Sequence, residues 1–509
     1  MTIENRRTPS KPSFCLAASV LALALFLSPV SAAAAVVCSG PQTYSVPGTY
    51  ATISLAVAAI TPTTLTEPVC VTIGDSSTYA EQVTVQGFTT GGSSITIQAA
   101  PGQFPVLQPP SFSTAAFMIA NDSVNVMGIA IAPPASIPYG IKASSAYVQI
   151  SSVSVIDGTG YITGAGVSIS SWSSISDSSV AVQNAYGVLL NGVGNTSITY
   201  TTITANGGSF AALYLNGASF NTITNSDISN PPGEAVYLNA GSSKNTISMS
   251  TMTSSAATKK ALYLWNSSSN AITQSFISNP LGYGASLIDS GYNTISLSTL
   301  TSNAGTAQAL YVTGTGSIYN LIANSAVSNP NGHAGMINFG ADHSDVVQST
   351  FTSNLASYRA LEINSVSSIT VTQSQFHSNI AGGYGLFVSS SIGVSVQQSQ
   401  MDSLGYGLWV DVSTGVKVTG SFVQGNPSAY IRASTGTLIS SGTLATPASG
   451  GALWIAGGNV GFAAANVTIS AVSATDGISL DNGAGMNAGL LSFSSITIVG
   501  PTSGFSISA

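Results

Sequence analysis

A short phrase recurs along this chain between residues 212 and 455, and its period limits what the chain can fold into. Ten steps across the 240 residues from Leu213 to Leu453 give a mean spacing of 24. A fixed period in this range is typical of stacked repeats, each too poor in core to fold alone. We therefore predict a solenoid. With the gaps filled, the equivalent positions are Leu213, Val236, Leu262, Ser286, Leu310, Met336, Leu361, Leu386, Leu408, Tyr430 and Leu453.

Within each repeat the apolar residues alternate, which is the spacing of a β-strand and not of a helix. Leu213 and Leu215 face one side and Tyr214 faces the other. A second short strand follows at 222–224, and a third is centred on Ile228. Three short strands per repeat, joined by polar turns, predict one coil of a parallel β-helix. A β-sandwich would instead show turn signals about every 8–12 residues.

The charge content is unusually low, at 5% of the residues against about 25% in ordinary soluble domains. Regularly spaced β-branched and aromatic residues nevertheless indicate a folded chain, because disordered chains lack them. The formal net charge is −7, and it becomes −9 without a leader that carries three basic residues and one acidic residue. Nucleic acid is therefore excluded as an expected partner, since phosphate binding needs a basic surface.

The N-terminus has the three parts of a secretory signal. A basic start at residues 6–11 precedes an apolar run over 15–27, and small residues suited to cleavage follow at 31–35. We predict a signal peptide over residues 1–35, and hence a secreted or cell-surface protein. No later segment has about 20 unbroken apolar residues, so we expect no membrane span after the signal is removed.

Two cysteines remain outside the predicted leader, Cys38 and Cys70. A disulfide between them is the economical interpretation for an even pair in an oxidising compartment. Two free thiols are the alternative. Neither residue has the spacing of a metal ligand, and we expect no cofactor.

Residues 50–60 are the one convincing amphipathic helix, and short strands follow at 71–73, 79–85 and 95–97. The helix phrase and the segment Tyr79-Ala80-Glu81-Gln82-Val83-Thr84-Val85 resemble the start of pectin methylesterases and, more broadly, the pectin lyase-like superfamily. The resemblance implies an all-β, right-handed parallel β-helix. The helix would cap its first coil, because an open coil exposes strand edges. We divide the chain into an N-terminal cap (36–110) and a repeat array (111–509).

The resemblance brings no catalytic residue with it, because no segment matches the catalytic motifs of pectin methylesterases, pectate lyases or polygalacturonases. Function must then be argued from a site. Stacking would bring His333, Arg359 and Glu362 to one corner, where a carboxylate beside His and Arg could serve in acid–base catalysis. The alternative is that sparse charges pair across coils, as we expect for Glu234 and Lys260.

Asp342 and Asp345, with His343 between them, are candidates for binding a hard cation.

Two columns of asparagine recur with the repeat, and we interpret both as structural. Asparagine tolerates the left-handed backbone of tight turns, and stacked amides can form a ladder of hydrogen bonds. The first column closes the third strand at Asn230, Asn279, Asn303, Asn329, Asn354 and Asn379. The second column opens the second strand at Asn195, Asn221, Asn245, Asn270, Asn293 and Asn320.

The position after each inward leucine is rich in aromatic residues, and we expect it to face outward. Exposed contiguous aromatics are typical of a binding surface, but cross-strand stacking alone could also place them there. Both interpretations stay open. The column reads Tyr214, Tyr237, Tyr263, Leu287, Tyr311, Ile337, Glu362, Phe387, Trp409, Ile431 and Trp454, of which the aromatic members are the predicted ligand-binding residues.

From these features we expect an exported, non-catalytic β-helix repeat protein with a structural or adhesin-like role at the cell surface. Its partner would be an extracellular polysaccharide, bound along the aromatic column, or another surface protein. The alternative is a polysaccharide-active enzyme, a lyase or hydrolase, centred on His333, Arg359 and Glu362.

Overall fold

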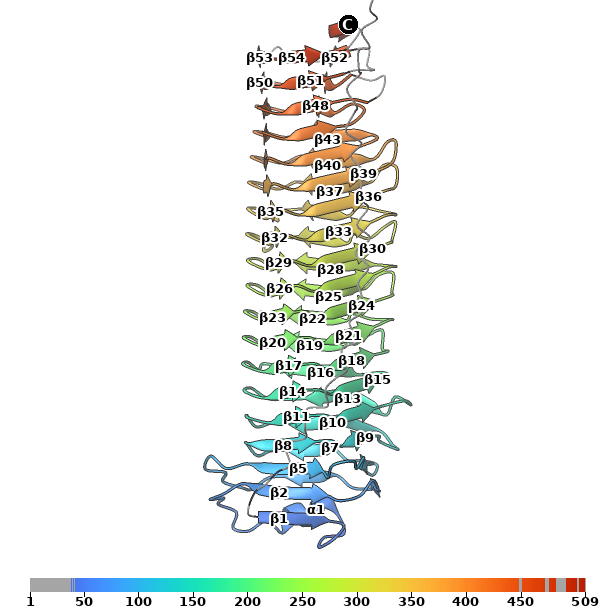
Figure 1. Ribbon diagram of the computed structural model, residues 1–509, viewed down its shortest axis with the longest axis vertical. Coiled ribbons are helices and arrows are strands. Elements are labelled where there is room, and N and C mark those ends of the chain that lie inside the picture. Colours follow the sequence, from blue (N-terminus) through green and yellow to red (C-terminus); the bar gives the residue numbers. More distant parts are fainter. Residues whose placement is uncertain are drawn as a thin grey trace, which may run out of the picture. The chain divides into compact units, whose positions relative to one another are not determined.

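The computed structural model describes residues 38, 40, 42–447, 451–471, 476–481, 491–500 and 503–508. Within these residues, coils follow one another in sequence order along a common axis (Figure 1). Each coil after the first gives one strand to each of three parallel sheets, which confirms the predicted all-β parallel β-helix. The predicted signal peptide, residues 1–35, lies outside the described residues.

Sheet 1 contains the strands that the sequence predicted as the second of each repeat. Its described strands are β1 (Gln42–Val46), β2 (Val69–Ile73), β5 (Ile95–Ala99), β8 (Val124–Met127), β11 (Gln149–Ser151), β14 (Ser174–Ser176), β17 (Ser197–Thr199), β20 (Thr222–Thr224), β23 (Thr246–Ser248), β26 (Ala271–Thr273), β29 (Thr294–Ser296), β32 (Leu321–Ala323), β35 (Asp345–Val347), β38 (Thr370–Thr372), β41 (Ser395–Gln397), β44 (Lys417–Thr419), β47 (Leu438–Ser440), β50 (Ala463–Ala465) and β53 (Ser492–Ser494).

Sheet 2 follows sheet 1 in every coil after the first. Its described strands are β3 (Thr78–Tyr79), β6 (Val106–Leu107), β9 (Ala130–Ile131), β12 (Ser154–Ile156), β15 (Ser179–Val182), β18 (Thr202–Ala205), β21 (Asp227–Asn230), β24 (Thr251–Ser254), β27 (Phe276–Asn279), β30 (Thr299–Ser302), β33 (Ala326–Asn329), β36 (Thr350–Ser353), β39 (Gln375–Ser378), β42 (Gln400–Ser403), β45 (Phe422–Gln424), β48 (Thr443–Ala445), β51 (Thr468–Ser470) and β54 (Thr497–Val499).

Sheet 3 contains the recurring phrase. Its described strands are β4 (Val83–Val85), β7 (Ala115–Ile119), β10 (Ile137–Ala143), β13 (Ile162–Ser168), β16 (Tyr186–Asn191), β19 (Leu213–Asn216), β22 (Val236–Asn239), β25 (Lys260–Trp265), β28 (Tyr283–Ile288), β31 (Leu310–Thr313), β34 (Gly335–Asn338), β37 (Arg359–Asn364), β40 (Tyr384–Ser389), β43 (Tyr406–Asp411), β46 (Ala429–Arg432), β49 (Leu453–Ile455), β52 (Asp476–Asp481) and β55 (Ser503–Ser508).

The core consists of inward rows in which residues one coil apart lie side by side. In sheet 1 an unbroken isoleucine row runs from β17 to β32, with each side chain at most 1% exposed. In sheet 2 the row includes two larger side chains, and Phe351 stacks on Phe376 with centroids 5.6 Å apart before the row continues with Met401. A coil cannot bury these rows alone, so stacking is the condition for folding.

Tight turns between the sheets rely on left-handed backbone. The turn from sheet 1 to sheet 2 places one residue near φ +50° in successive coils, for example Asn225 at 49° and Gln373 at 50°. Beneath this turn a buried serine row follows the stack, and the backbone N–H of Ser250 donates to the hydroxyl of Ser275 at 3.3 Å. The backbone path of this corner is therefore the same from coil to coil.

Three positions of the predicted phrase alignment are wrong by one residue. The inward partners of the leucines are Ala285, Gly335 and Ala429, where filling the gaps predicted Ser286, Met336 and Tyr430. A Cβ on Gly335 would lie 2.5 Å from a ring carbon of Phe351, so the phenylalanine fills this inward space. In each case the sequence alignment favoured the larger of two neighbouring residues, whereas the core holds the smaller one.

The second asparagine column is confirmed as a ladder from Asn221 to Asn320. The side-chain amide of Asn245 donates to Asn270 Oδ1 at 3.0 Å, and Asn270 donates to Asn293 Oδ1 at 3.2 Å. Asn195 lies one residue before the ladder, at φ 56°.

The first asparagine column is only partly correct. Buried Asn230, Asn279 and Asn329 alternate with serines such as Ser254, and their amides donate to backbone carbonyls of the preceding connection. The register places Ser302, Ser353 and Ser378 in this column, so the predicted members Asn303, Asn354 and Asn379 are each one residue too late.

The first coil is covered by α1 (Ile53–Ala58), which is shorter than the predicted helix over 50–60. Thr52 caps its start, and the Glu81 carboxylate accepts from the backbone N–H groups of Ile53 and Ser54 at 2.8 and 2.9 Å. The predicted strand 79–85 is interrupted at Glu81, which leaves β3 and β4 as separate strands. None of the described helices could cross a bilayer.

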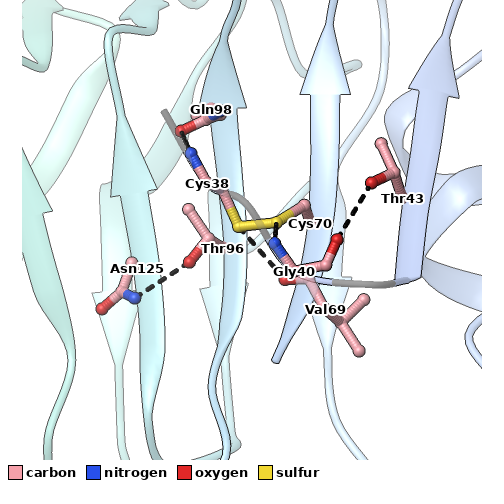
Figure 2. The surroundings of a disulfide bond; sticks show 8 residues. All are labelled: Cys38, Gly40, Thr43, Val69, Cys70, Thr96, Gln98 and Asn125. Atoms are coloured by element: carbon pink, nitrogen blue, oxygen red, sulfur yellow. Dashed lines mark hydrogen bonds between the residues drawn. A yellow bond between two sulfur atoms is a disulfide. The ribbon is translucent and has the colours of Figure 1, made fainter. Parts of the chain in front are cut away.

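A disulfide joins Cys38 to Cys70 in β2, which confirms that prediction over the two free thiols. The pair lies against the neighbouring strands (Figure 2), where the backbone N–H of Cys38 donates to Gln98 Oε1 at 3.2 Å and that of Gly40 donates to Cys70 Sγ at 3.2 Å. The disulfide therefore links Cys38, which precedes β1, to β2 in the first coils.

Candidate functional site

The outer face of sheet 3 carries the predicted aromatic column, with a corrected membership. Leu287, Ile337 and Ile431 are fully buried in the core and do not belong to it. The register puts Ser286, Met336 and Tyr430 in the outward positions instead. We call the half-buried aromatic members the aromatic face: Tyr214, Tyr237, Tyr263, Tyr311, Phe387, Trp409, Tyr430 and Trp454.

The rings of the aromatic face stack on one another along the coil axis. Tyr214 and Tyr237 have centroids 5.2 Å apart, and Tyr237 and Tyr263 lie 4.7 Å apart with planes tilted by only 9°. Phe387, Trp409 and Tyr430 continue the pattern in later coils, at 6.1 and 4.2 Å. Within these runs neighbouring rings cover one another's faces and leave ring edges at the surface. Trp454 instead packs edge-on against Tyr430, and Tyr311 lies between Ser286 and Met336.

Two cations cover ring faces where the run of aromatics is broken. Lys260 Nζ lies 4.6 Å from the centroid of Tyr263, next to the coil that holds Ser286. Arg359 Cζ lies 4.5 Å from Phe387, next to the coil that holds Met336. These cation–π contacts stabilise the aromatic face, and they hold the positive charges of Lys260 and Arg359 against its rings.

Polar groups extend the aromatic face along the ends of its strands. The hydroxyl of Tyr214 donates to Asn216 Oδ1 at 3.3 Å, and Asn239 Nδ2 donates to the same hydroxyl at 3.2 Å. Burial and the neighbouring tyrosines raise the pKa of Tyr237, so its hydroxyl remains a neutral donor and acceptor. The face can therefore offer a repeated row of hydroxyl and amide groups.

The structure brings His333, Arg359 and Glu362 together as predicted. Glu362 Oε2 lies 3.5 Å from His333 Nδ1 and 3.7 Å from Arg359 Nε. Glu362 is 8% exposed, and both nitrogens are buried without a hydrogen-bond partner of good geometry among the described residues. Tyr358 packs edge-on against the His333 ring at 4.9 Å.

The electrostatics of this cluster favour neutral side chains. Burial and the Arg359 charge lower the pKa of His333 to about 4. Burial raises the pKa of Glu362, although Arg359 opposes that shift. The lowered pKa keeps His333 uncharged near neutral pH, so its 3.5 Å contact with Glu362 is not an ion pair there.

Asp342 and Asp345 do not join this cluster. His333 precedes β34, whereas Asp342 follows it and accepts from the backbone N–H of Ser367 at 2.6 Å. His343 stacks on Tyr319 at 4.9 Å. Throughout the part of the chain that the structure describes, no three His, Cys, Asp or Glu side chains gather as metal ligands would.

Two other ion pairs lie at the ends of sheet 3 strands. Lys259, and not Lys260 as predicted, pairs with Glu234 at 3.1 Å, while Lys260 covers the tyrosine ring. Asp411 accepts two bonds from Arg432, at 2.8 and 2.6 Å, in a bidentate pair that the sequence analysis missed.

Comparison with known proteins bears on the fold. Residues 163–327 match the family model described as the right-handed β-helix region. The chain is a right-handed parallel β-helix protein. This confirms the fold that the pectin lyase-like resemblance implied. No curated protein sequence matches this β-helix protein.

Solved structures give distant similarity. Tailspike protein 3 of bacteriophage CBA120 is 12% identical, with 86% of this chain and 56% of that chain covered and a TM-score of 0.25. The A-module of mannuronan C-5 epimerase AlgE4 from Azotobacter vinelandii is 10% identical (82% and 90% covered, TM-score 0.29). PfbA, a surface adhesin of Streptococcus pneumoniae, is 10% identical (86% and 85% covered, TM-score 0.26). The β-helix protein thus spans little more than half of the tailspike, and at these TM-scores none of the three informs its function.

Proposed function

We propose that this β-helix protein is an exported, non-catalytic protein that binds neutral polysaccharide along the aromatic face. The observation that carries the proposal is the half-buried row of aromatic side chains, in register on the outer face of sheet 3. Strands lie about 4.8 Å apart, so two unbroken runs, from Tyr214 to Tyr263 and from Phe387 to Trp454, repeat their rings at that interval. A linear polymer with repeated hydroxyl groups fits such a surface better than a compact ligand does.

The charge balance supports a neutral ligand. The whole chain has ten Lys and Arg against seventeen Asp and Glu, and Lys260 and Arg359 on this face are already placed over rings. A polyanion would find little free positive charge there. Hydroxyl and amide groups, which both donate and accept, match the hydroxyls of a neutral sugar chain.

The burial of the His333 cluster favours binding over catalysis. Glu362 is 8% exposed, contacts His333 and Arg359, and is paired in register with Phe387 of the next coil. A general acid or base must come within hydrogen-bond reach of the proton that it transfers. The buried carboxyl leaves little room for a sugar oxygen, so a structural role suits it better.

The test measures retention of the mature protein on cellulose, starch, xylan and chitin. Tyr237→Phe combined with Tyr263→Phe keeps the stacked rings and removes only two hydroxyls, so we expect several-fold weaker retention with unchanged folding. Tyr292→Phe is the matched control, because Tyr292 is an exposed tyrosine outside sheet 3. Absence of retention on all four polymers, or equal retention of both variants, contradicts the proposal.

One observation favours the enzyme alternative, since buried ring and guanidinium nitrogens without partners can mark a reactive site. If the alternative held, the wild-type protein would release reducing ends or unsaturated products from one of these polymers, and Glu362→Gln would abolish that release. We expect no turnover from either protein.

A further inference from the structure

A hollow of about 420 Å³ lies at the turn from sheet 1 to sheet 2, on a corner to which the aromatic face contributes no residue. Its volume falls in the range of about 300–1,000 Å³ that is common for ligand sites. Five glutamines and one aromatic ring line it: Gln348, Gln373, Gln375, Gln398, Gln400 and Phe422. We call it the glutamine groove.

The turn itself presents three of these glutamines in a row. Gln348, Gln373 and Gln398 occupy the left-handed position of three successive coils, at φ 48°, 50° and 48°. Left-handed backbone costs a residue other than glycine about 1–2 kcal/mol, and glycine or asparagine would adopt it more easily. Here the position instead holds long amide side chains that extend outward and are exposed.

The floor of the groove is rigid. Beneath the turn, the backbone N–H of Ser374 donates to the hydroxyl of Ser399 at 3.2 Å, and that of Ser399 donates to Ser421 at 3.1 Å. All three serines are buried. The turn that carries the glutamines is therefore fixed before any ligand arrives, which lowers the entropic cost of binding.

Gly420 gives the groove its depth. It takes the place of glutamine in the coil after Gln398, and a Cβ there would meet only Gln398 Cγ, at 3.6 Å. The missing side chain leaves space between Gln398 and Phe422, whose ring is 37% exposed. The hollow thus combines an amide wall with an accessible aromatic ring.

The donor and acceptor inventory points to the class of ligand. Gln373 Nε2 donates to Gln398 Oε1 at 3.3 Å, and among the described residues the Gln400 amide has no hydrogen-bond partner. No charged residue lines the hollow, and nearby His377 and Asp402 lie 3.9 Å from each other on the next outward positions of sheet 2. Amides pair with groups that both donate and accept, and an exposed ring packs against C–H surfaces.

We propose that the glutamine groove binds a short stretch of neutral oligosaccharide, with its hydroxyls on the glutamine amides and one sugar against Phe422. The site is separate from the aromatic face, so the inference does not rest on the proposed function. Binding at either site can be disproved without disproving binding at the other.

Isothermal titration of the mature protein with cellohexaose, maltohexaose and xylohexaose tests the proposal, with hexagalacturonate as the charged comparison. We expect at least one neutral hexasaccharide to bind. Loss of amide contacts in Gln398→Ala should weaken binding about tenfold. Gly420→Gln should abolish binding, because it extends the amide row into the hollow. Neighbouring glutamines already adopt that backbone conformation, so the variant should fold.

Gln274→Ala is the matched control, because Gln274 occupies the same left-handed turn position in a coil outside the groove. We expect unchanged binding for it. In the double variant Tyr237→Phe with Tyr263→Phe, which alters only the aromatic face, we expect the binding that Gln398→Ala weakens to remain. Three results would overturn the proposal: no neutral hexasaccharide binds, Gln274→Ala weakens binding as much as Gln398→Ala does, or hexagalacturonate binds as tightly. Loss of binding in the double tyrosine variant would place the hexasaccharide on the aromatic face and also overturn it.

Discussion

Replacing Asn270 with alanine tests whether the buried asparagine ladder holds the coils together. Asn270 is 2% exposed, and its Oδ1 accepts from the backbone N–H and the amide of Asn245, both at 3.0 Å. Its Nδ2 donates to the carbonyl of Ser242 at 3.0 Å and to the next ladder residue. Alanine leaves at least the Asn245 N–H and the Ser242 carbonyl buried without partners. At about 1–3 kcal/mol for each group, the local cost is about 4 kcal/mol.

The effect should be local, because each coil of a solenoid contacts only its neighbours. In hydrogen–deuterium exchange with mass spectrometry, a loss of about 4 kcal/mol accelerates exchange up to about a thousandfold. We expect this acceleration in peptides that cover residues 240–300 and no change in peptides that cover 400–440. Asn354→Ala is the control, since Asn354 is exposed and accepts only from Asn379, at 3.1 Å. Equal exchange in the two variants would refute the role of the ladder.

Three further predictions concern the described coils. The pKa of His333 is lowered to about 4 in the folded chain, so between pH 6.5 and 4 the unfolded chain binds a proton that the folded chain does not. The free energy of unfolding should therefore fall by about 3 kcal/mol as the pH drops through this range. Denaturation measured at several pH values should show that His333→Gln loses this dependence. Cys38→Ser should destabilise the first coils by about 3–4 kcal/mol, measured by their exchange rates. Gly335→Ala should cost about 1–3 kcal/mol through its clash with Phe351, and Phe351→Leu should restore part of that loss in thermal melts.

The fold could be predicted from the sequence because the residue types that stabilise stacked coils recur with the period of the repeat. Alternation around Leu213 gave the strand direction, and the asparagine ladder from Asn221 to Asn320 marked one corner of successive coils. The predictions failed where the core accepts small residues. Gly335 sits inward because a ring from another strand fills its space, and no local pattern in the sequence reveals that ring.

The candidate sites were predictable to different degrees. Counting one repeat period was enough to place His333 beside Arg359 and Glu362, because the parallel register puts residues one coil apart side by side. Their pKa shifts depend on burial, which the sequence does not give. The glutamine groove was missed because its hollow depends on the missing side chain of Gly420, beside glutamines that looked like ordinary turn residues.

Cross-linking of engineered cysteines tests the central claim, that residues one coil apart lie side by side in parallel register. Thr222 and Thr246 are paired across β20 and β23 and lie outside the core. Thr222→Cys with Thr246→Cys should form a disulfide under mild oxidation, detected by peptide mass mapping. Thr222→Cys with Ser248→Cys should not, because that pair is two residues out of register and beyond the reach of about 7 Å between Cα atoms. The opposite pattern, or bonding in neither pair, would contradict the stacked coil.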